Sequence, residues 1–291
     1  MYVLISACLL LVAAGRTQTN GMNVPLARGL GLEKLMEGME YLKKYSYIHL
    51  DAGKDGNGLD MAMIKSGIGK YQVFHGLPKT EMIDEETLDK MDLPRCGCRD
   101  PEFTGEAERD EFRYWLEGGM WNKTELTVRI SRIPNLMSKK SVRRVLKQAC
   151  RVWSSRSPLT FTEVRSGGAD INVKFMGTMD HGDRRAFWRP LGEVGHAFSP
   201  SDPALPGDIH LDASESYSFE EETDGINLFQ LLVHELGHTL GLGHSPHPQS
   251  VMYPIARAYD PAFELSRNDM AGLHALYGRK SRARLRNRQR H

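Results

Sequence analysis

Residues 234–244 read HELGHTLGLGH and carry more information than any other part of the chain. His234 and His238 are four residues apart, so on a helix they lie on one face and can hold one metal ion. Gly241 can end this helix and let the chain turn back, which brings in His244 as a third ligand. Three neutral imidazoles leave one position of a tetrahedral Zn²⁺ open, as in catalytic zinc sites.

Two further residues fit a catalytic site. Glu235 stands beside the first histidine, where its carboxylate can accept a proton from a water molecule at the metal. Met252 follows in SVMYP, eight residues after His244. The long histidine pattern with a downstream methionine turn resembles the signature of the metzincin proteases. The alternative is a buried helix with incidental histidines.

A second motif, PRCGCRD, occupies residues 94–100. A thiolate can fill the open position of a zinc ion and exclude water, which keeps a protease precursor inactive. Here the chain resembles the matrix metalloproteinases, whose propeptide carries P-R-C-G-x-P-D. The resemblance implies that Cys96 binds the catalytic zinc in the latent form and that Arg95 and Asp100 form an ion pair. A structural or incidental thiol is the alternative.

The cysteines also depart from the family pattern. Cys98 stands at its variable position, and Arg99 replaces the proline. A second thiol so close to the first could compete for zinc or oxidise with it, so we expect looser or redox-sensitive latency. Cys150 has the spacing of the apolar face of a helix, which favours a buried thiol over a disulfide.

The composition is that of a soluble globular protein, with 40% hydrophobic and 26% charged residues among 291. Residues 1–15 form one apolar run that ends in small residues. This run predicts a secretory signal peptide, with a retained signal anchor as the alternative. No later segment is apolar enough to span a bilayer. We therefore expect a monomer secreted to the extracellular space or matrix.

Beyond the signal peptide, the chain divides into a helical propeptide (16–113), a catalytic domain (114–278) and a basic tail (279–291). Three propeptide segments have helical apolar spacing. In the catalytic part, TELTVRIS and ADINVKFM predict strands, and SKKSVRRVLKQACRVWSS predicts a long amphipathic helix. The mixture predicts an α+β fold. The resemblance implies a metzincin domain, with a twisted mixed sheet and an active-site helix, after a small all-α prodomain. It also implies a minimal, matrilysin-like architecture without a hemopexin-like domain.

A second metal site is indicated by HGD at 181–183 and two later histidines. Three imidazoles and one carboxylate would close a tetrahedral site, so this zinc would be structural. The resemblance implies the ligands His181, Asp183, His196 and His210, and hence two zinc ions per chain. Surface histidines that cluster by chance are the alternative.

Calcium is also implied by the resemblance, because carboxylates match family calcium ligands. They are Asp212 and Glu215 for one site and Asp170 and Asp208 for another. The family loop F-D-G-P-x-G reads FWRPLGE here, with Trp188 and Arg189 in place of aspartate and glycine. We expect the first site to be weakened or absent unless Glu193 compensates.

The resemblance also places the substrate. A peptide would lie extended along an edge strand near Val194 and Gly195, by β-augmentation. Ala256 replaces the tyrosine of the family's P-x-Y and alters the wall of the specificity pocket, while Gln230 lines its floor. The expected reaction is peptide hydrolysis, in which Glu235 passes the proton of a zinc-polarised water to the leaving amine.

The tail, RKSRARLRNRQRH, carries seven Lys or Arg, so the preceding residues have a net charge of about −6. Such runs are usually disordered and solvated. The functional alternative is that the tail binds glycosaminoglycan or another polyanion. Nucleic acid is not expected for a secreted chain. The resemblance implies extracellular protein or peptide substrates and protein inhibitors of metalloproteinases. The rival function is a non-catalytic, zinc-stabilised binding module targeted to polyanions, which has no chemical need for Glu235.

Overall fold

The computed structural model describes residues 30–49, 61–102, 114–134, 137–177, 183, 187, 192–219, 225–257 and 259–280. The predicted signal peptide, most of the basic tail, His181 and the FWRPLGE substitutions Trp188 and Arg189 lie outside these ranges. Within them, the helices are too short or too polar to cross a membrane.

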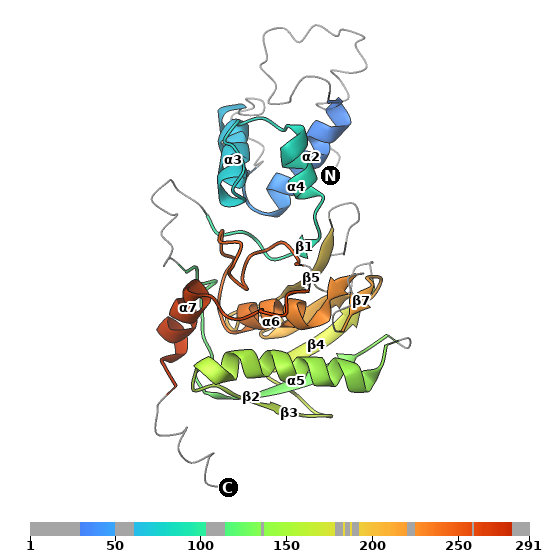
Figure 1. Ribbon diagram of the computed structural model, residues 1–291, viewed down its shortest axis with the longest axis vertical. Coiled ribbons are helices and arrows are strands. Elements are labelled where there is room, and N and C mark those ends of the chain that lie inside the picture. The colour runs from blue at the N-terminus through green and yellow to red at the C-terminus, as the bar shows by residue number, and fades with distance from the viewer. Residues whose placement is uncertain are drawn as a thin grey trace, which may run out of the picture.

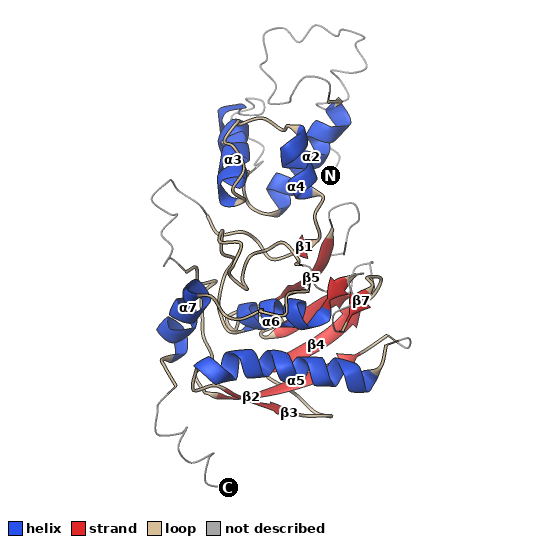
Figure 2. Ribbon diagram, in the orientation of Figure 1, coloured by secondary structure: helices blue, strands red, loops and turns tan. Residues whose placement is uncertain are grey.

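An N-terminal helical region forms one end of the molecule (Figures 1 and 2). Its helices lie where the apolar spacing predicts them, at α2 (Leu32–Lys44), α3 (Met61–Phe74) and α4 (Glu85–Met91). They enclose an aromatic-rich core of their own, which includes Tyr41, Tyr45 and Tyr71. This region is therefore a separate packing unit on top of the sheet.

A six-stranded mixed sheet forms the other part (Figure 2). Its strand order is β1-β5-β6-β4-β2-β3, and β5 is antiparallel to β6 while the other pairs are parallel. The strands are β1 (Arg95–Cys96), β2 (Glu125–Arg132), β3 (Thr160–Glu163), β4 (Ile171–Met176), β5 (Glu193–Ala197) and β6 (Asp208–Asp212). A small parallel pair, β7 (Tyr217–Ser218) with β8 (Ile226–Asn227), lies beside the sheet.

Three helices accompany this sheet, namely α5 (Lys139–Arg156), α6 (Leu228–Thr239) and α7 (Arg267–Tyr277). The apolar face of α5 packs into the main core, and Trp153 near the C-terminal end of the helix donates a hydrogen bond to the carbonyl of Val233 in α6 (3.0 Å). Side-chain caps from Ser138 and Asn227 begin α5 and α6. The predicted α+β class is confirmed.

Strand β1 is not predicted by any local pattern. Its two residues pair with β5, a segment about a hundred residues later, and the Arg95 amide donates to the carbonyl of Gly192 (2.8 Å). On its other side the Cys96 amide donates to the carbonyl of Pro254 (2.9 Å). The motif PRCGCRD is thus held between the edge of the sheet and the chain that follows Met252.

Candidate functional site

Helix α6 presents the motif histidines at its C-terminal end. His234 and His238 lie one turn apart, and the helix ends at Thr239. Gly241 then has a φ of +98°, a value that residues other than glycine rarely adopt. The chain turns here so that His244 faces the helix. A Cβ on Gly237 would lie 2.3 Å from the sulfur of Met252, so glycine lets the methionine turn pack directly under α6.

Four side chains converge above this turn, and we call them the α6 cluster: Cys96, His234, His238 and His244. The Nε2 atom of His234 lies 3.1 Å from that of His238 and 3.3 Å from that of His244. The Sγ atom of Cys96 lies 3.5 Å from Nε2 of His238. Zn–N bonds of about 2.0–2.1 Å put two nitrogens of a tetrahedral site about 3.4 Å apart, so these spacings fit a zinc ion.

The outer ring nitrogens explain why the Nε2 atoms point together. Nδ1 of His234 lies 2.8 Å from the carbonyl of Val251, and Nδ1 of His238 lies 2.9 Å from that of Leu242. A carbonyl oxygen only accepts, so each Nδ1 carries the proton and each Nε2 turns a lone pair inward. Burial lowers the pKa of His234, which keeps its ring in the neutral form that binds metal.

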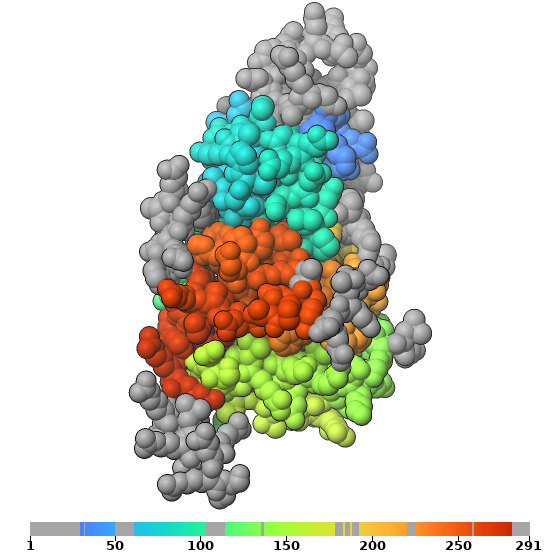
Figure 3. Space-filling model, viewed as in Figure 1, coloured from blue at the N-terminus to red at the C-terminus, as the bar shows by residue number. Residues whose placement is uncertain are grey.

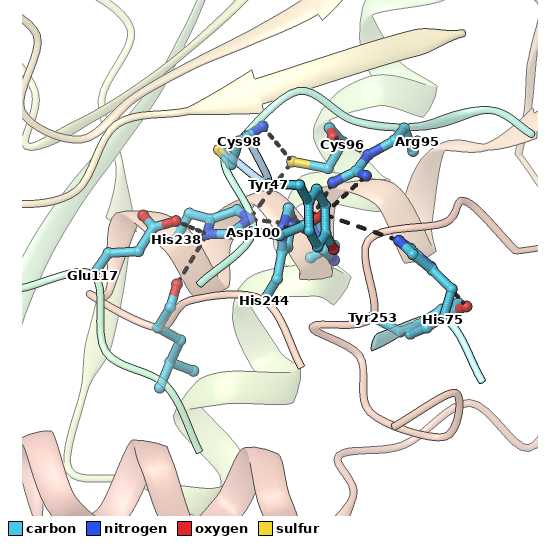
Figure 4. Close-up of polar contacts among 12 residues, drawn as sticks. Tyr47, His75, Arg95, Cys96, Cys98, Asp100, Glu117, His238, His244 and Tyr253 are labelled. Atoms are coloured by element: carbon cyan, nitrogen blue, oxygen red, sulfur yellow. Dashed lines mark hydrogen bonds and ion pairs between the residues drawn. The ribbon is translucent and has the colours of Figure 1, made fainter. Parts of the chain in front are cut away.

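Carboxylates contact the outer nitrogens of His238 and His244 (Figure 4). Glu117 lies 3.1 Å from Nδ1 of His238, and Asp100 of the PRCGCRD segment lies 2.7 Å from Nδ1 of His244. Neither contact is predicted from the sequence, since each joins residues more than a hundred positions apart. Carboxylates at this position orient a metal-binding imidazole and raise its basicity.

Asp100 also pairs with the arginine of the motif, as the resemblance implies. Two nitrogens of Arg95 lie 3.0 and 2.7 Å from its two carboxylate oxygens. Tyr47 of the helical region donates to the same carboxylate (2.8 Å), and the Arg95 guanidinium lies over the ring of Tyr45 at 3.6 Å. Burial alone would raise the pKa of Asp100, but Arg95 and His244 hold it well below its ordinary value. The helical region and the α6 cluster thus share one buried charge network.

The two motif thiols have different surroundings. Burial and the neighbouring Cys98 raise the pKa of the Cys96 thiol, so a bound cation would be needed to make it a good thiolate ligand. The Cys98 thiol donates to the carbonyl of Ala197 (3.3 Å) in β5. Cys96, Cys98 and Cys150 are all free and buried, and Cys150 lies in α5 as its spacing predicts.

Glu235 is fully buried beside the α6 cluster, and neither of its carboxylate oxygens has a hydrogen-bond partner among the described residues. Burial is the main cause that raises the pKa of Glu235 to about 8. A buried carboxyl without a partner is costly to keep, and such groups gather at functional sites. This carboxyl is suited to take up and release a proton near neutral pH.

The second set of predicted ligands forms the β5–β6 cluster: Asp183, His196 and His210. One oxygen of Asp183 lies 2.8 Å from Nε2 of His196 and 2.8 Å from Nδ1 of His210. His181, the fourth predicted ligand, lies outside the described residues. Burial favours the neutral imidazole, but bonds to Asp183 and Glu193 raise the pKa of His196 to about 9.

Glu193 links this cluster to the N-terminal helical region. One oxygen lies 2.6 Å from Nδ1 of His196, and the other lies 2.5 Å from the ammonium of Lys44 in α2. Its carboxylate also covers Gly97, where any Cβ would collide with it. Sequence reasoning connected Glu193 only with calcium. The one available signal was an acidic residue three positions before a predicted histidine ligand.

The predicted calcium ligands are engaged in protein contacts. Asp170 accepts from the amide and hydroxyl of Thr127 and pairs with Lys123 (2.8 Å). Asp208 pairs with Lys174. The side chain of Asp212 accepts from Ser214, and Glu215 follows just after it. Calcium binding by these residues stays a prediction.

The predicted substrate residues border the PRCGCRD segment. The Gly97 amide donates to the carbonyl of Gly195 (2.8 Å), next to Val194, and the Ala256 amide donates to that of Pro94 (2.8 Å). The segment therefore lies in an extended slot between β5 and the backbone of residues 254–256. A small cavity of about 30 Å³ opens beside His234 and includes Gln230 and Ala256 in its lining.

Comparisons with known proteins agree with this geometry. The family model described as matrixin matches residues 120–278. The chain is 37% identical to Matrix metalloproteinase-19 of Mus musculus over 87% of its length, and 36% identical to Neutrophil collagenase of Homo sapiens over 83%. It spans only about half of each of these relatives. It is also 35% identical to Matrilysin of Rattus norvegicus, over 84% of this chain and 86% of that protein.

Proposed function

Because the chain belongs to the matrixin family, we propose that it is a secreted zinc endopeptidase made as a latent precursor. Its substrates would be proteins of the extracellular matrix or other extracellular proteins. The observation that carries the proposal is the α6 cluster, where three inward-facing imidazoles meet the Cys96 thiol at spacings that suit zinc. The proposed parts are a signal peptide (1–15), a propeptide (16–113), a catalytic domain (114–278) and a basic tail (279–291).

His234, His238 and His244 would hold the catalytic zinc, and Cys96 would be its fourth ligand in the latent form. When bound, the metal would polarise a water molecule and the carbonyl of the scissile peptide. Glu235 would act as the general base and then as the general acid that protonates the leaving amine. Burial favours the protonated form of this carboxyl, as suits a group that takes up a proton and passes it on.

Latency would follow from the position of the PRCGCRD segment. Cys96 fills the fourth ligand position, and the flanking backbone fills the slot between β5 and Pro254. A peptide substrate needs the same two sets of backbone groups for β-augmentation, near Val194 and Gly195 on one side and Ala256 on the other. Removal of the propeptide would therefore free the ligand position and the binding slot together.

The remaining parts would support this activity. Asp183, His196 and His210, with His181, would hold a structural zinc, and carboxylates near β4 and β6 would bind calcium. The cavity lined by Gln230 and Ala256 would receive a substrate side chain. Extracellular protein inhibitors and, for the basic tail, glycosaminoglycan are the proposed partners of a monomeric enzyme.

The test is cleavage of a quenched fluorogenic peptide by the purified full chain, before and after treatment with a thiol-reactive mercurial. We expect low activity before treatment and a large increase after it. Glu235→Gln should lower the activated rate by about 10²–10⁴-fold while zinc content stays the same. A chain that binds zinc but stays inactive after propeptide removal would favour a non-catalytic binding module instead.

A further inference from the structure

Helix α5 carries an unusual concentration of charge. Seven of its residues are lysine or arginine, and none is acidic. Its apolar face, which includes Val145 and Trp153, is buried in the main core, so the basic residues gather on the outer side. Lys147 and Arg151, one helical turn apart, are both exposed at the centre of this side. Like charges so close together repel one another, so this face costs stability unless something offsets the repulsion.

The basic side of α5 borders a groove of about 1050 Å³ between the helix and the edge strand β3. Among the described residues that line it, five are cationic and one, Glu163, is acidic. The cationic residues are Arg143, Lys147, Arg151, Arg279 and Lys280. Hydroxyl groups of Ser154, Thr160 and Thr162 lie along the same walls. The groove therefore combines positive charge with hydrogen-bonding groups.

The start of the basic tail is built into this groove. Lys280 donates to the carbonyl of Ser154 near the C-terminal end of α5 (2.7 Å), and Arg279 lines the groove beside it. In the sequence that follows, every second residue from Arg282 to Arg290 is an arginine. Two segments far apart in the sequence thus bring cations to one place, which a solvated charge run alone does not explain.

The shape, charge and hydroxyl groups of the groove favour a linear polyanion as its ligand. A linear polyanion could follow the groove, whereas a flat anionic membrane would touch only its rim. Sulfate and carboxylate groups would meet the cations, and sugar hydroxyls would meet Ser154 and the threonines of β3. The groove offers no exposed row of aromatic rings for stacking bases, which is a usual element of single-strand nucleic-acid sites.

We propose that the groove between α5 and β3 is a binding site for a sulfated glycosaminoglycan chain. The groove lies at the end of the molecule away from the N-terminal helical region (Figures 1 and 3). Glycosaminoglycan would therefore bind the latent and the processed forms equally and would leave the slot beside β5 open. The choice of this polyanion rests on the proposed extracellular location, but its binding does not depend on catalysis.

The test measures binding of a heparin dodecasaccharide to the full latent chain by calorimetry over a series of salt concentrations. The groove variant is Lys147→Ala with Arg151→Ala. The matched control, Lys70→Ala with Lys79→Ala, removes the same charge from the helical region. We expect the groove variant alone to lose about tenfold or more in affinity and to lower the salt slope by about two. A chain that ends at Lys280 should still bind heparin, more weakly than the full chain.

Three results would overturn the proposal. One is a groove variant that binds like the wild type while the chain ending at Lys280 does not bind, because the tail would then act alone. Another is binding of single-stranded DNA or of phosphatidylserine vesicles as tight as that of heparin. The third is no binding at about 0.15 M salt. Peptide cleavage, measured on the same samples, reports separately on the proposed protease function.

Discussion

The two histidine clusters differ in what their ring nitrogens face. In the α6 cluster the imidazoles turn their lone pairs toward one another, and a thiol completes the group. In the β5–β6 cluster a carboxylate, Asp183, already lies between the two described histidines at hydrogen-bonding distance. The first arrangement points ring nitrogens at one another, which suits a shared cation, while the second already has a carboxylate between its histidines.

The clusters also differ in where their outer contacts come from. Nδ1 of His244 contacts Asp100, which lies in the segment that would be removed on activation. Nδ1 of His196 contacts Glu193, which lies in β5 itself. The departure of the N-terminal region would therefore change the α6 cluster directly. It would reach the β5–β6 cluster through Glu193, which pairs with Lys44 and packs over Gly97.

The largest expected effect concerns stability without metal. In chelator-treated protein, His196→Ala should cost about 3–5 kcal/mol of unfolding free energy, because it leaves Asp183 and Glu193 buried without their cationic partner. His234→Ala is the matched variant and should cost about 1–3 kcal/mol, since it removes a neutral ring from the Val251 carbonyl. Urea unfolding measures both. Equal losses would remove the distinction between the clusters.

The next effect concerns latency. Cys96→Ser should raise the activity of the unprocessed chain by about tenfold or more, because a loss of 1.4 kcal/mol in ligand binding already gives that factor. Cys98→Ser is the comparison. Cys98 lies with Cys96, Glu235 and His238 in a second group of possible metal ligands, so the expected competition between the two thiols predicts tighter latency in this variant. The measurement is peptide cleavage by both unprocessed variants. If Cys98→Ser released the activity instead, the assignment of the switch thiol would be wrong.

An intermediate effect depends on pH. His75 is buried against Asp100 and Tyr253, and burial lowers its pKa from 6.5 to about 3. The unfolded region binds this proton more readily, so stability falls as pH drops below 6.5, and the loss continues until about pH 3. From pH 7 to 5 the loss should be about 2 kcal/mol.

Urea unfolding of the N-terminal region at both pH values tests this expectation. His75→Phe should abolish most of the difference, while His49→Gln, a change at an exposed histidine of the same region, should preserve it. A pH dependence that survives in His75→Phe would assign it to another group. The contribution of Asp100 is separate, because the depressed pKa of its carboxyl confines its loss to more acidic solutions.

The smallest effect tests the indirect link. Lys44→Ala removes the ammonium from Glu193 and should weaken docking of the helical region by about 1 kcal/mol or less, because the lysine is partly exposed. Lys34→Ala, which breaks an exposed pair with Glu37, should have no effect on docking. The rate of propeptide cleavage by an added protease reports the change. An equal rate for both variants would show that the pair of Lys44 with Glu193 does not contribute to docking.

Local patterns predicted much of this molecule. The spacing of His234, His238 and His244 and the break at Gly241 are properties of neighbouring residues, so the sequence carried them. The same holds for α5, whose apolar period is clear, and for the three N-terminal helices. Each of these features follows from helical periodicity or from a glycine with positive φ.

The missed features all depend on distant segments. Strand β1 forms only because β5 offers its edge, and two residues have no period to detect. The contacts of Glu117, Asp100 and Lys44 join residues whose approach is set by the packing of whole elements. No local sequence pattern predicts contacts between such residues. A carboxylate beside a metal-binding histidine is nevertheless a general expectation.

Strand β1 has one more consequence. When it leaves, the carbonyls of Gly192 and Gly195 lose the amides that they now accept from, and β5 becomes an open sheet edge. Open edges pair with any extended chain, including another copy of the same protein. The propeptide would therefore protect the stored protein against self-association as well as against premature activity. High concentrations would be tolerated before processing and harmful after it.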